Sequence, residues 1–314
     1  MSNRRGEMSI ERLKELVRER SKRGELPLDE RRKVMDGNAV MFPVPAGVAV
    51  ERADLGGLGA EWAIPKGAED APVVLYFHGG GYLVGSSVSH RHLTSRLALA
   101  SKSRVLSVDY ALAPEHPFPA AVNDGLKAYR WLLDKGHAAE RIAMGGDSAG
   151  GGLTVATLLA ARDAGLPMPA GAVLISPWTD LTCATGSYVS CADLDPMIDA
   201  AGIRDTAATY LNGADARHPL ASPNFADLAG LPPMLIHVGT DEVLLDDARD
   251  LEKRARAARV EAELEVWDGM IHVWHAFYQM LPEGERALDR LGDYISARWK
   301  VSGKTDEKQG AALR

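Results

Sequence analysis

The sequence predicts an α/β fold in which a mostly parallel β-sheet is covered by helices on both faces. Two observations carry this prediction. Short apolar runs alternate with helix-length segments along most of the chain, and several of the runs are strongly apolar, as strands buried on both faces of a sheet are. The chain has 314 residues, enough for one such core together with a small accessory region or lid.

An amphipathic helix and a hairpin are predicted before the alternating part. Between Ser9 and Arg23, apolar residues including Leu13 and Val17 share one helical face among charged neighbours. Strands are then expected at Val48 to Arg52 and at Ala60 to Ile64, on either side of a turn-rich segment.

The alternating part supplies six further strands and the helices between them. The expected strands are Val73 to Phe77, Arg104 to Val108, Arg141 to Met144, Ala172 to Ile175, Met234 to Val238 and Ala262 to Val266. The expected helices are Val88 to Ala100, Ala120 to Leu133, Ala149 to Arg162, Asp246 to Ala257 and Pro282 to Trp299. Each helix is long enough to return the chain for another parallel strand.

Two segments depart from this alternation of strands and helices. The interval Leu181 to Asp227 is longer than an ordinary connection and carries helical pieces around Pro196 to Leu211, so we interpret it as an insertion that forms lid material. The polar, small-residue-rich end from Val301 to Arg314 is expected to be disordered.

Charge and composition exclude several classes of protein. The formal net charge is −7 and no basic cluster occurs outside the helical opening, so no nucleic-acid partner is expected. The longest apolar runs are strand-sized, which predicts no membrane insertion. Charged residues interrupt Met1 to Arg20, so we expect no signal peptide and a cytoplasmic protein. In that compartment the two cysteines, Cys183 and Cys191, are expected to be reduced thiols.

The strongest chemical motif is Gly146-Asp147-Ser148-Ala149-Gly150. It follows one predicted strand and opens a predicted helix, as the G-x-S-x-G nucleophile elbow does. The serine of such an elbow sits on a strained, tight turn that projects its hydroxyl, and glycines prevent collisions with the adjoining strand and helix. Ser148 is therefore the predicted nucleophile.

A glycine run, His78-Gly79-Gly80-Gly81, directly follows the strand that ends at Phe77. Backbone N–H groups in such a run can point at a developing oxyanion without obstruction from side chains. We assign Gly80 and Gly81, together with the N–H of Ala149, as oxyanion donors.

A nucleophilic serine needs a histidine base, and the histidine needs a carboxylate that orients it. In the order typical of this elbow the acid comes next along the chain and the histidine last. His272 follows the strand ending at Val266, and we prefer it to His275, which lies where a helix has begun. Asp241 follows the strand ending at Val238 and is preferred as the acid because it is nearest to the strand end.

The competing carboxylates and histidines are interpreted as structural. Glu242, Asp246 and Asp247 read best as helix-start caps or surface charges. The remaining histidines are expected to be structural or exposed: His90, His92, His116, His137, His218 and His237.

Motifs for cofactor chemistry are not found. Gly79 to Gly85 and Gly145 to Gly150 both fail the G-x-G-x-x-G spacing, and there is no phosphate loop, H-E-x-x-H helix or paired C-x-x-C. The predicted chemistry needs no cofactor and no metal.

With these motifs the sequence resembles the hormone-sensitive-lipase family of bacterial α/β-hydrolase carboxylesterases, also called bacterial family IV, over about Ala71 to Arg298. The resemblance rests on four ordered blocks: His78 to Gly81, Asp109 to Glu115 with Phe118 to Ala121, Gly146 to Gly151, and Gly269 to His272. The family usually has Asp-Pro-Leu at the acid, whereas this chain has Asp241-Glu242-Val243-Leu244.

The resemblance implies an α/β-hydrolase fold with a mostly parallel eight-stranded sheet and a helical cap. The cap would comprise residues 1–44 and the insertion 182–220, and the core residues 45–181 and 221–300, followed by the tail 301–314. It also implies short-chain acyl esters as substrates and a homodimer. Bacterial monoterpene lactone hydrolases look similar, so a lactone substrate stays open.

We expect hydrolysis through an acyl-Ser148 intermediate. Tyr82, Leu83, Met197 and Ile198 are candidates for lining the acyl pocket, although such side chains are more often simple core residues. The rival hypothesis is a small-molecule receptor on the same fold. Plant hormone receptors that resemble these esterases lack the catalytic histidine, whereas this chain retains His272.

Overall fold

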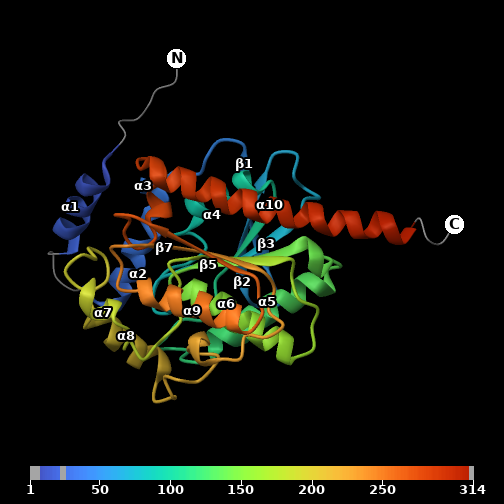
Figure 1. Ribbon diagram of the computed structural model, residues 1–314. Helices are drawn as coiled ribbons and strands as arrows, with labels where there is room; N and C mark the ends of the chain where they lie inside the picture. The colour runs from blue at the N-terminus through green and yellow to red at the C-terminus, as the bar shows by residue number, and fades with distance from the viewer. Residues whose placement is uncertain (1–7, 22–25, 311–314) are drawn as a thin grey trace.

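A computed structural model of the chain describes residues 8–21 and 26–310. Its centre is an eight-stranded sheet in the order β1-β2-β4-β3-β5-β6-β7-β8, in which β2 runs antiparallel to both of its neighbours and all other pairs are parallel (Figure 1). This confirms the predicted fold class, the α/β-hydrolase sheet and the hairpin of the first two strands.

The strands lie where the apolar runs predicted them, with ends that differ by a few residues. They are β1 (Val48–Asp54), β2 (Gly59–Pro65), β3 (Val73–Phe77), β4 (Arg104–Val108), β5 (Ile142–Asp147), β6 (Gly171–Ile175), β7 (Met234–Gly239) and β8 (Ala262–Trp267). Every residue of β3, β5, β6 and β7 is buried, because helices cover both faces of the middle of the sheet.

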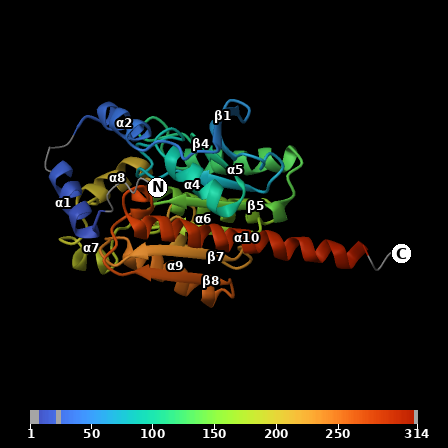
Figure 2. The ribbon, with the colours of Figure 1, turned by 90° about the horizontal axis from the view of Figure 1, so that it is seen from above.

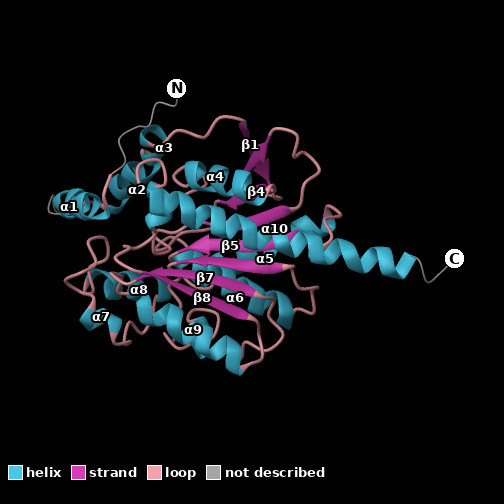
Figure 3. Ribbon diagram, turned by 45° about the horizontal axis from the view of Figure 1, so that its top comes forward, coloured by secondary structure: helices cyan, strands magenta, loops and turns pink. Residues whose placement is uncertain are grey.

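One face is covered by α4 (Arg91–Ser101) and α10 (Pro282–Gly310), which cross in front of the strands in Figure 3. Their apolar residues recur at helical spacing and form one buried cluster with the side chains of that sheet face. That cluster includes Leu93, Leu97, Leu288, Leu291 and Ile295.

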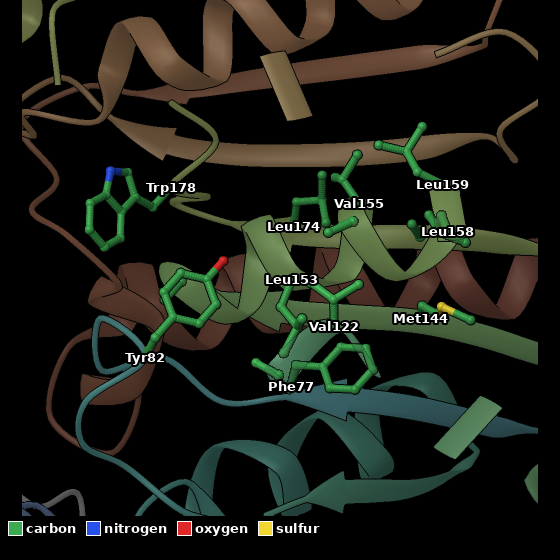
Figure 4. Close-up of a cluster of buried hydrophobic side chains, with 14 of the residues drawn as sticks. Phe77, Tyr82, Val122, Met144, Leu153, Val155, Leu158, Leu159, Leu174 and Trp178 are labelled. Carbon is green, nitrogen blue, oxygen red and sulfur yellow. The ribbon is translucent and has the colours of Figure 1, made fainter. Parts of the chain in front are cut away.

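The opposite face is covered by α5 (Ala120–Asp134), α6 (Ala149–Asp163) and α9 (Leu245–Ala257). Helix α6 is buried on almost all sides, as expected for a helix whose sequence is apolar all round. Its side chains Leu153, Val155 and Leu158 lie at the centre of the main apolar core, and Tyr82 and Trp178 lie together at one end of the same cluster (Figure 4).

The accessory helices gather at one end of the molecule. Helices α1 (Ile10–Ser21), α2 (Leu28–Asp36), α7 (Ser187–Ser190) and α8 (Gly202–Leu211) lie on the same side in both ribbon views (Figures 1 and 2), and α3 (Asn38–Met41) follows α2. The insertion therefore does carry helices, although the one expected from Pro196 begins at Gly202. Residues 1–7 and 22–25 of the proposed cap lie outside the described residues.

The C-terminal helix corrects one expectation. We expected it to stop at Trp299 and the chain to be disordered from Val301, whereas α10 continues to Gly310. Between 301 and 310 the sequence has no proline, and its two lysines, one glutamate and one glutamine are residues of high helix propensity. Residues 311–314 lie outside the described part.

Two further expectations concern the cysteines and the membrane. Cys183 and Cys191 are both buried free thiols, as predicted. Among the described helices, none is both long enough and apolar enough to cross a bilayer.

Candidate active site

The predicted chemical groups meet at the carboxyl edge of the sheet. Strands β3, β5, β6, β7 and β8 are parallel and in register there, with Asp147 opposite Ile175, Ile175 opposite His237, and Gly239 opposite Trp267. The loops that follow these strands therefore emerge side by side, as active-site loops of open α/β sheets do.

Ser148 occupies a strained turn between β5 and α6. Its backbone has φ 55° and ψ −123°, a conformation that L-residues avoid unless the surroundings impose it. The turn is held because the Ser148 N–H donates to the carbonyl of Ile175 at 2.8 Å and the Ser148 carbonyl accepts from the N–H of Trp178 at 2.9 Å. A Cβ at Gly150 would lie 2.0 Å from the carbonyl oxygen of Phe77, so glycine is required there.

Asp147 fixes the base of this turn. Its carboxylate accepts a hydrogen bond from the Tyr76 hydroxyl at 2.7 Å and pairs with Nε2 of His90 at 3.2 Å. Burial alone would raise the pKa of Asp147. The charge and hydrogen bond of His90, together with the hydrogen bond from Tyr76, outweigh burial and lower this pKa below its ordinary value. His90 thus has the structural role that we expected.

The glycine run lies directly against the elbow. Gly80 and Gly81 have φ values of 118° and 64°, and a Cβ at Gly80 would lie 2.2 Å from the carbonyl oxygen of Val84. Within the described part of the chain, the N–H groups of Gly80, Gly81 and Ala149 donate no hydrogen bond. Three backbone donors beside Ser148 are therefore free to bind an anionic oxygen.

The carboxylate that contacts His272 is Glu242. Nδ1 of His272 donates to Oε2 of Glu242 at 3.0 Å, and the glutamate side chain is completely buried. The other glutamate oxygen, Oε1, accepts from the N–H of Gly239 at 2.6 Å and from the Ser176 hydroxyl at 2.8 Å. Our interpretation of Glu242 as a cap or surface charge is wrong.

Asp241, which we predicted to orient His272, faces the other way. Its N–H donates to the carbonyl of Met270, and its carboxylate lies 2.8 Å from Nζ of Lys14 on α1. The prediction that Asp241 orients His272 is therefore corrected to Glu242. Proximity to the strand end was a poor guide, because successive residues of the turn after β7 point their side chains in different directions.

The other rejected candidates are mostly structural. Asp247 is fully buried and accepts from the N–H groups of Thr179 and Asp180, so it is not a surface charge. Asp246 accepts from the N–H of Ser187. His275 lies in the short helix η3 (Trp274–Phe277), where its Nε2 is 3.1 Å from Nδ1 of buried His237.

The two loops that carry the acid and the histidine are bound to each other. The hydroxyl of Thr240 accepts from the N–H of Gly269 at 2.8 Å. From the insertion, buried Asp195 accepts from the N–H of Val243 at 3.0 Å. This aspartate was not among the predicted residues, because its contact depends on how the insertion folds back onto the acid loop.

The hydrogen bond to Glu242 determines which nitrogen of His272 can act as a base. A carboxylate can only accept, so Nδ1 carries the proton and Nε2 remains with a free lone pair. Burial lowers the pKa of His272, but the hydrogen bond and charge of Glu242, with the charges of Asp195 and Asp147, outweigh burial and raise it.

Ser148 and His272 flank the same loop, residues 175–178. Ser148 bonds to Ile175 and Trp178, and Val273, the residue after His272, donates to Ser176. Among the described residues the Ser148 hydroxyl has no hydrogen-bond partner. Contacts between a nucleophile and its base are often long without substrate and shorten in the reactive complex.

The predicted pocket residues are not all equivalent. Tyr82 is buried and stacks on Tyr210 of α8, with ring centroids 3.8 Å apart, so it joins the glycine loop to the insertion. Leu83 is also buried. Met197 is 41% exposed, and Ile198 is half-buried. Sequence reasoning did not single out Ser176, whose signal is only its place directly after β6.

The fold and the site together define an α/β-hydrolase. A family model described as alpha/beta hydrolase fold matches residues 74–276. The chain is 50% identical over 236 residues to an acetyl-hydrolase of Streptomyces hygroscopicus, covering 75% of this chain and 79% of that protein.

Solved structures similar to this chain are esterases, which specifies the kind of α/β-hydrolase more closely. An esterase/lipase from an uncultured bacterium is similar with a TM-score of 0.89 and 52% identity, over 93% of this chain and 98% of that one. An esterase from the bacterial hormone-sensitive lipase family is similar with a TM-score of 0.90 and 46% identity, over 92% and 98%. The chain belongs to the hormone-sensitive-lipase family, as its motifs indicated.

Proposed function

We propose that this protein is a serine carboxylesterase that hydrolyses short-chain acyl esters through an acyl-Ser148 intermediate. The observation that carries the proposal is the arrangement of Ser148 on its strained turn beside three unpaired N–H groups and a buried His272–Glu242 pair. The relatives named as acetyl-hydrolase and esterase support the class of substrate.

In the proposed first half of the reaction, Nε2 of His272 takes the proton of Ser148 as its oxygen attacks the ester carbonyl. The carbonyl oxygen becomes an anion that accepts hydrogen bonds from Gly80, Gly81 and Ala149. The imidazolium ion of His272 then gives its proton to the departing alcohol. Glu242 stabilises that imidazolium ion and keeps the ring in the required orientation throughout.

In the second half, a water molecule attacks the acyl-enzyme and the same groups act in the same order. His272 takes a proton from the water, and Ser148 leaves with that proton as the acid is released. Every proton is carried by the chain's own residues, so this mechanism requires no metal ion or cofactor.

The test uses the purified protein with p-nitrophenyl butyrate and a fluorophosphonate probe. The wild-type protein should hydrolyse the ester and become labelled at Ser148, and Ser148→Ala should lower kcat by about 10⁶-fold without a loss of folded protein. A Ser148→Ala protein that keeps near-wild-type turnover would overturn the proposal.

A second series of substrates sets the specificity. Hydrolysis rates should fall as the acyl chain lengthens from acetate to palmitate, because we propose a short acyl site. A lactone panel measured beside the esters decides between ester and lactone substrates. Higher kcat/KM for lactones than for every ester would replace the ester assignment while leaving the serine mechanism intact.

A further inference from the structure

The loop after β6 contains a buried hydroxyl that touches both the acid and the histidine loop. Ser176 is completely buried, and its backbone has φ 45°. Its N–H donates to the carbonyl of His237 at 2.7 Å, which fixes the residue between β6 and β7. Its side chain is therefore held under the site and not on the surface.

The Ser176 hydroxyl makes two hydrogen bonds of opposite sense. It donates its single proton to Oε1 of Glu242 at 2.8 Å and accepts from the N–H of Val273 at 3.1 Å. Because Oε2 of Glu242 accepts from His272, these groups form a closed ring. The ring runs from the carboxylate through Ser176 to the backbone of Val273, and through His272 back to the carboxylate.

This ring restrains the rotation of the carboxylate. Oε1 is bound by both Ser176 and the N–H of Gly239, so the carboxylate plane is fixed and Oε2 points at Nδ1 of His272. Without the Ser176 hydroxyl, one donor remains on Oε1, and the terminal torsion of a glutamate is otherwise soft.

The same hydroxyl holds the histidine backbone in a costly conformation. Val273 has φ 50°, a left-handed value that is unfavourable for a β-branched residue. Such a conformation persists only when neighbouring groups enforce it, and the hydrogen bond from Val273 N–H to Ser176 is one of those constraints. Ser176 thus determines the position of both partners of the acid–histidine pair.

We propose that Ser176 is a positioning residue that acts through Glu242 and His272 and never touches the substrate. The inference rests on the proposed serine mechanism and deepens it. Its consequence is that removal of one hydroxyl should slow the chemical step while leaving substrate binding in place.

The test compares Ser176→Ala and Ser176→Gly with the wild-type protein on p-nitrophenyl butyrate. Glycine tolerates the φ of 45°, so Ser176→Gly keeps the test valid if the alanine variant folds poorly. Both variants should lower kcat by about 10- to 100-fold, the range found when a partner that orients a metal-binding histidine is removed, with KM within about twofold of wild type.

A double-mutant cycle separates positioning from a general structural role. In a Glu242→Gln background, Ser176→Ala should lower kcat by clearly less than in the wild-type background, because one of the two groups through which Ser176 acts, the Glu242 carboxylate, has already been removed, while the hydrogen bond from Val273 remains. The matched control is Ser101→Ala, which removes an equally buried hydroxyl bonded to the carbonyl of Leu97. That variant should retain wild-type kcat.

The pH profile gives an independent readout. The Ser176 hydroxyl, as a donor to Oε1 of Glu242, favours the unprotonated form of the Glu242–His272 pair. Its removal should therefore move the acidic limb of the kcat/KM profile, where activity falls as pH falls, to higher pH. Besides Glu242, the titratable groups that face His272 are Asp195, Asp147 and His275, and the Ser176 hydroxyl bonds none of them. Ser101→Ala should leave the limb unchanged.

The outcomes distinguish this inference from the proposed function. If wild type is active through Ser148 but Ser176→Ala and Ser176→Gly keep its kcat and acidic limb, the positioning role is wrong and the serine mechanism stands. An undiminished effect of Ser176→Ala in the Glu242→Gln background also overturns it. If wild type itself is neither active nor labelled, the proposed function has failed first.

Discussion

Glu242 and His272 form a buried pair, with Nδ1 of the histidine 3.0 Å from Oε2 of the glutamate, while the neighbouring carboxylate of Asp241 faces Lys14. Two adjacent acidic residues on one turn therefore have different partners. Only Glu242 can control the tautomer of His272, and this difference between the two carboxylates can be measured.

Glu242→Gln should lower kcat by about 10⁴-fold, because an amide can present its NH₂ group to His272 and favour the wrong tautomer. Asp241→Asn is the matched control, since it changes the adjacent carboxylate in the same way and should alter kcat by only a few-fold. Steady-state kinetics on p-nitrophenyl butyrate measures both. The reverse ranking would restore Asp241 as the orienting acid.

The contrast between these two residues shows what the sequence could predict. The fold and the positions of Ser148, the glycine run and His272 depend on local patterns: a strand, a turn with glycines, and the order of motifs along the chain. The fold prediction is confirmed by the structure. These patterns are readable because each is complete within a few residues.

The acid could not be chosen in the same way. Asp241 and Glu242 are one residue apart, and the direction of each side chain is set by contacts from elsewhere: Lys14 on α1 for the first, Ser176 and His272 for the second. Ser176 and Asp195 were missed for the same reason. A lone serine after a strand and an aspartate in an insertion have no local signature.

The pH dependence of kcat/KM should report the environment of His272. Burial lowers the pKa of this histidine, but the hydrogen bond and charge of Glu242 together with the charges of Asp195 and Asp147 raise it, so the net pKa lies above the ordinary value of 6.5. The neutral imidazole is the active base. Activity should therefore be lost as pH falls, with a midpoint above 6.5.

The profile can be measured by chromatography of the alcohol released from a butyrate ester, which avoids a pH-sensitive chromophore. Glu242→Gln removes the anion that raises the pKa, so its acidic limb should move to lower pH. A wild-type midpoint below 6.5, or a limb that Glu242→Gln leaves in place, would contradict the assigned cause.

Gly80→Ala should disable the glycine loop. The added Cβ would lie 2.2 Å from the carbonyl oxygen of Val84, and Gly80 itself has φ 118°. The loop must therefore move, and its N–H groups no longer point at the oxyanion. Loss of such a donor lowers kcat by about 10²- to 10³-fold.

Gly136→Ala provides the control. Gly136 also has a positive φ, 86°, but a Cβ there meets nothing within 4 Å. Both variants carry backbone strain of about 1–2 kcal/mol, so both should lower the melting temperature, whereas only Gly80→Ala should reduce kcat. Equal kcat losses in the two would show that strain, and not the oxyanion donors, is responsible.

The contact between Lys14 and Asp241 should anchor α1 over the site. Lys14 has a side chain that is only 7% exposed and lies 2.8 Å from Asp241, and the preceding residue, Leu13, belongs to a buried cluster with Met270 and Ile271 of the histidine loop. Lys14→Met keeps the apolar stem but leaves Asp241 without this cation. We expect a loss of about 1–3 kcal/mol in the free energy of unfolding, as for other hydrogen bonds to charged groups.

A double-mutant cycle of Lys14→Met with Asp241→Asn should give a coupling energy of about 0.5–3 kcal/mol, measured by urea unfolding. Lys33→Met on α2 is the control, because Lys33 pairs with exposed Asp29 and Glu30, and exposed pairs contribute about 0–1 kcal/mol. Since Lys14 does not contact His272, the acidic limb of kcat/KM should stay at its wild-type position in every variant of the cycle. A coupling near zero would mean that α1 is held by its apolar face alone, and a shifted limb would mean that Asp241 influences the base after all.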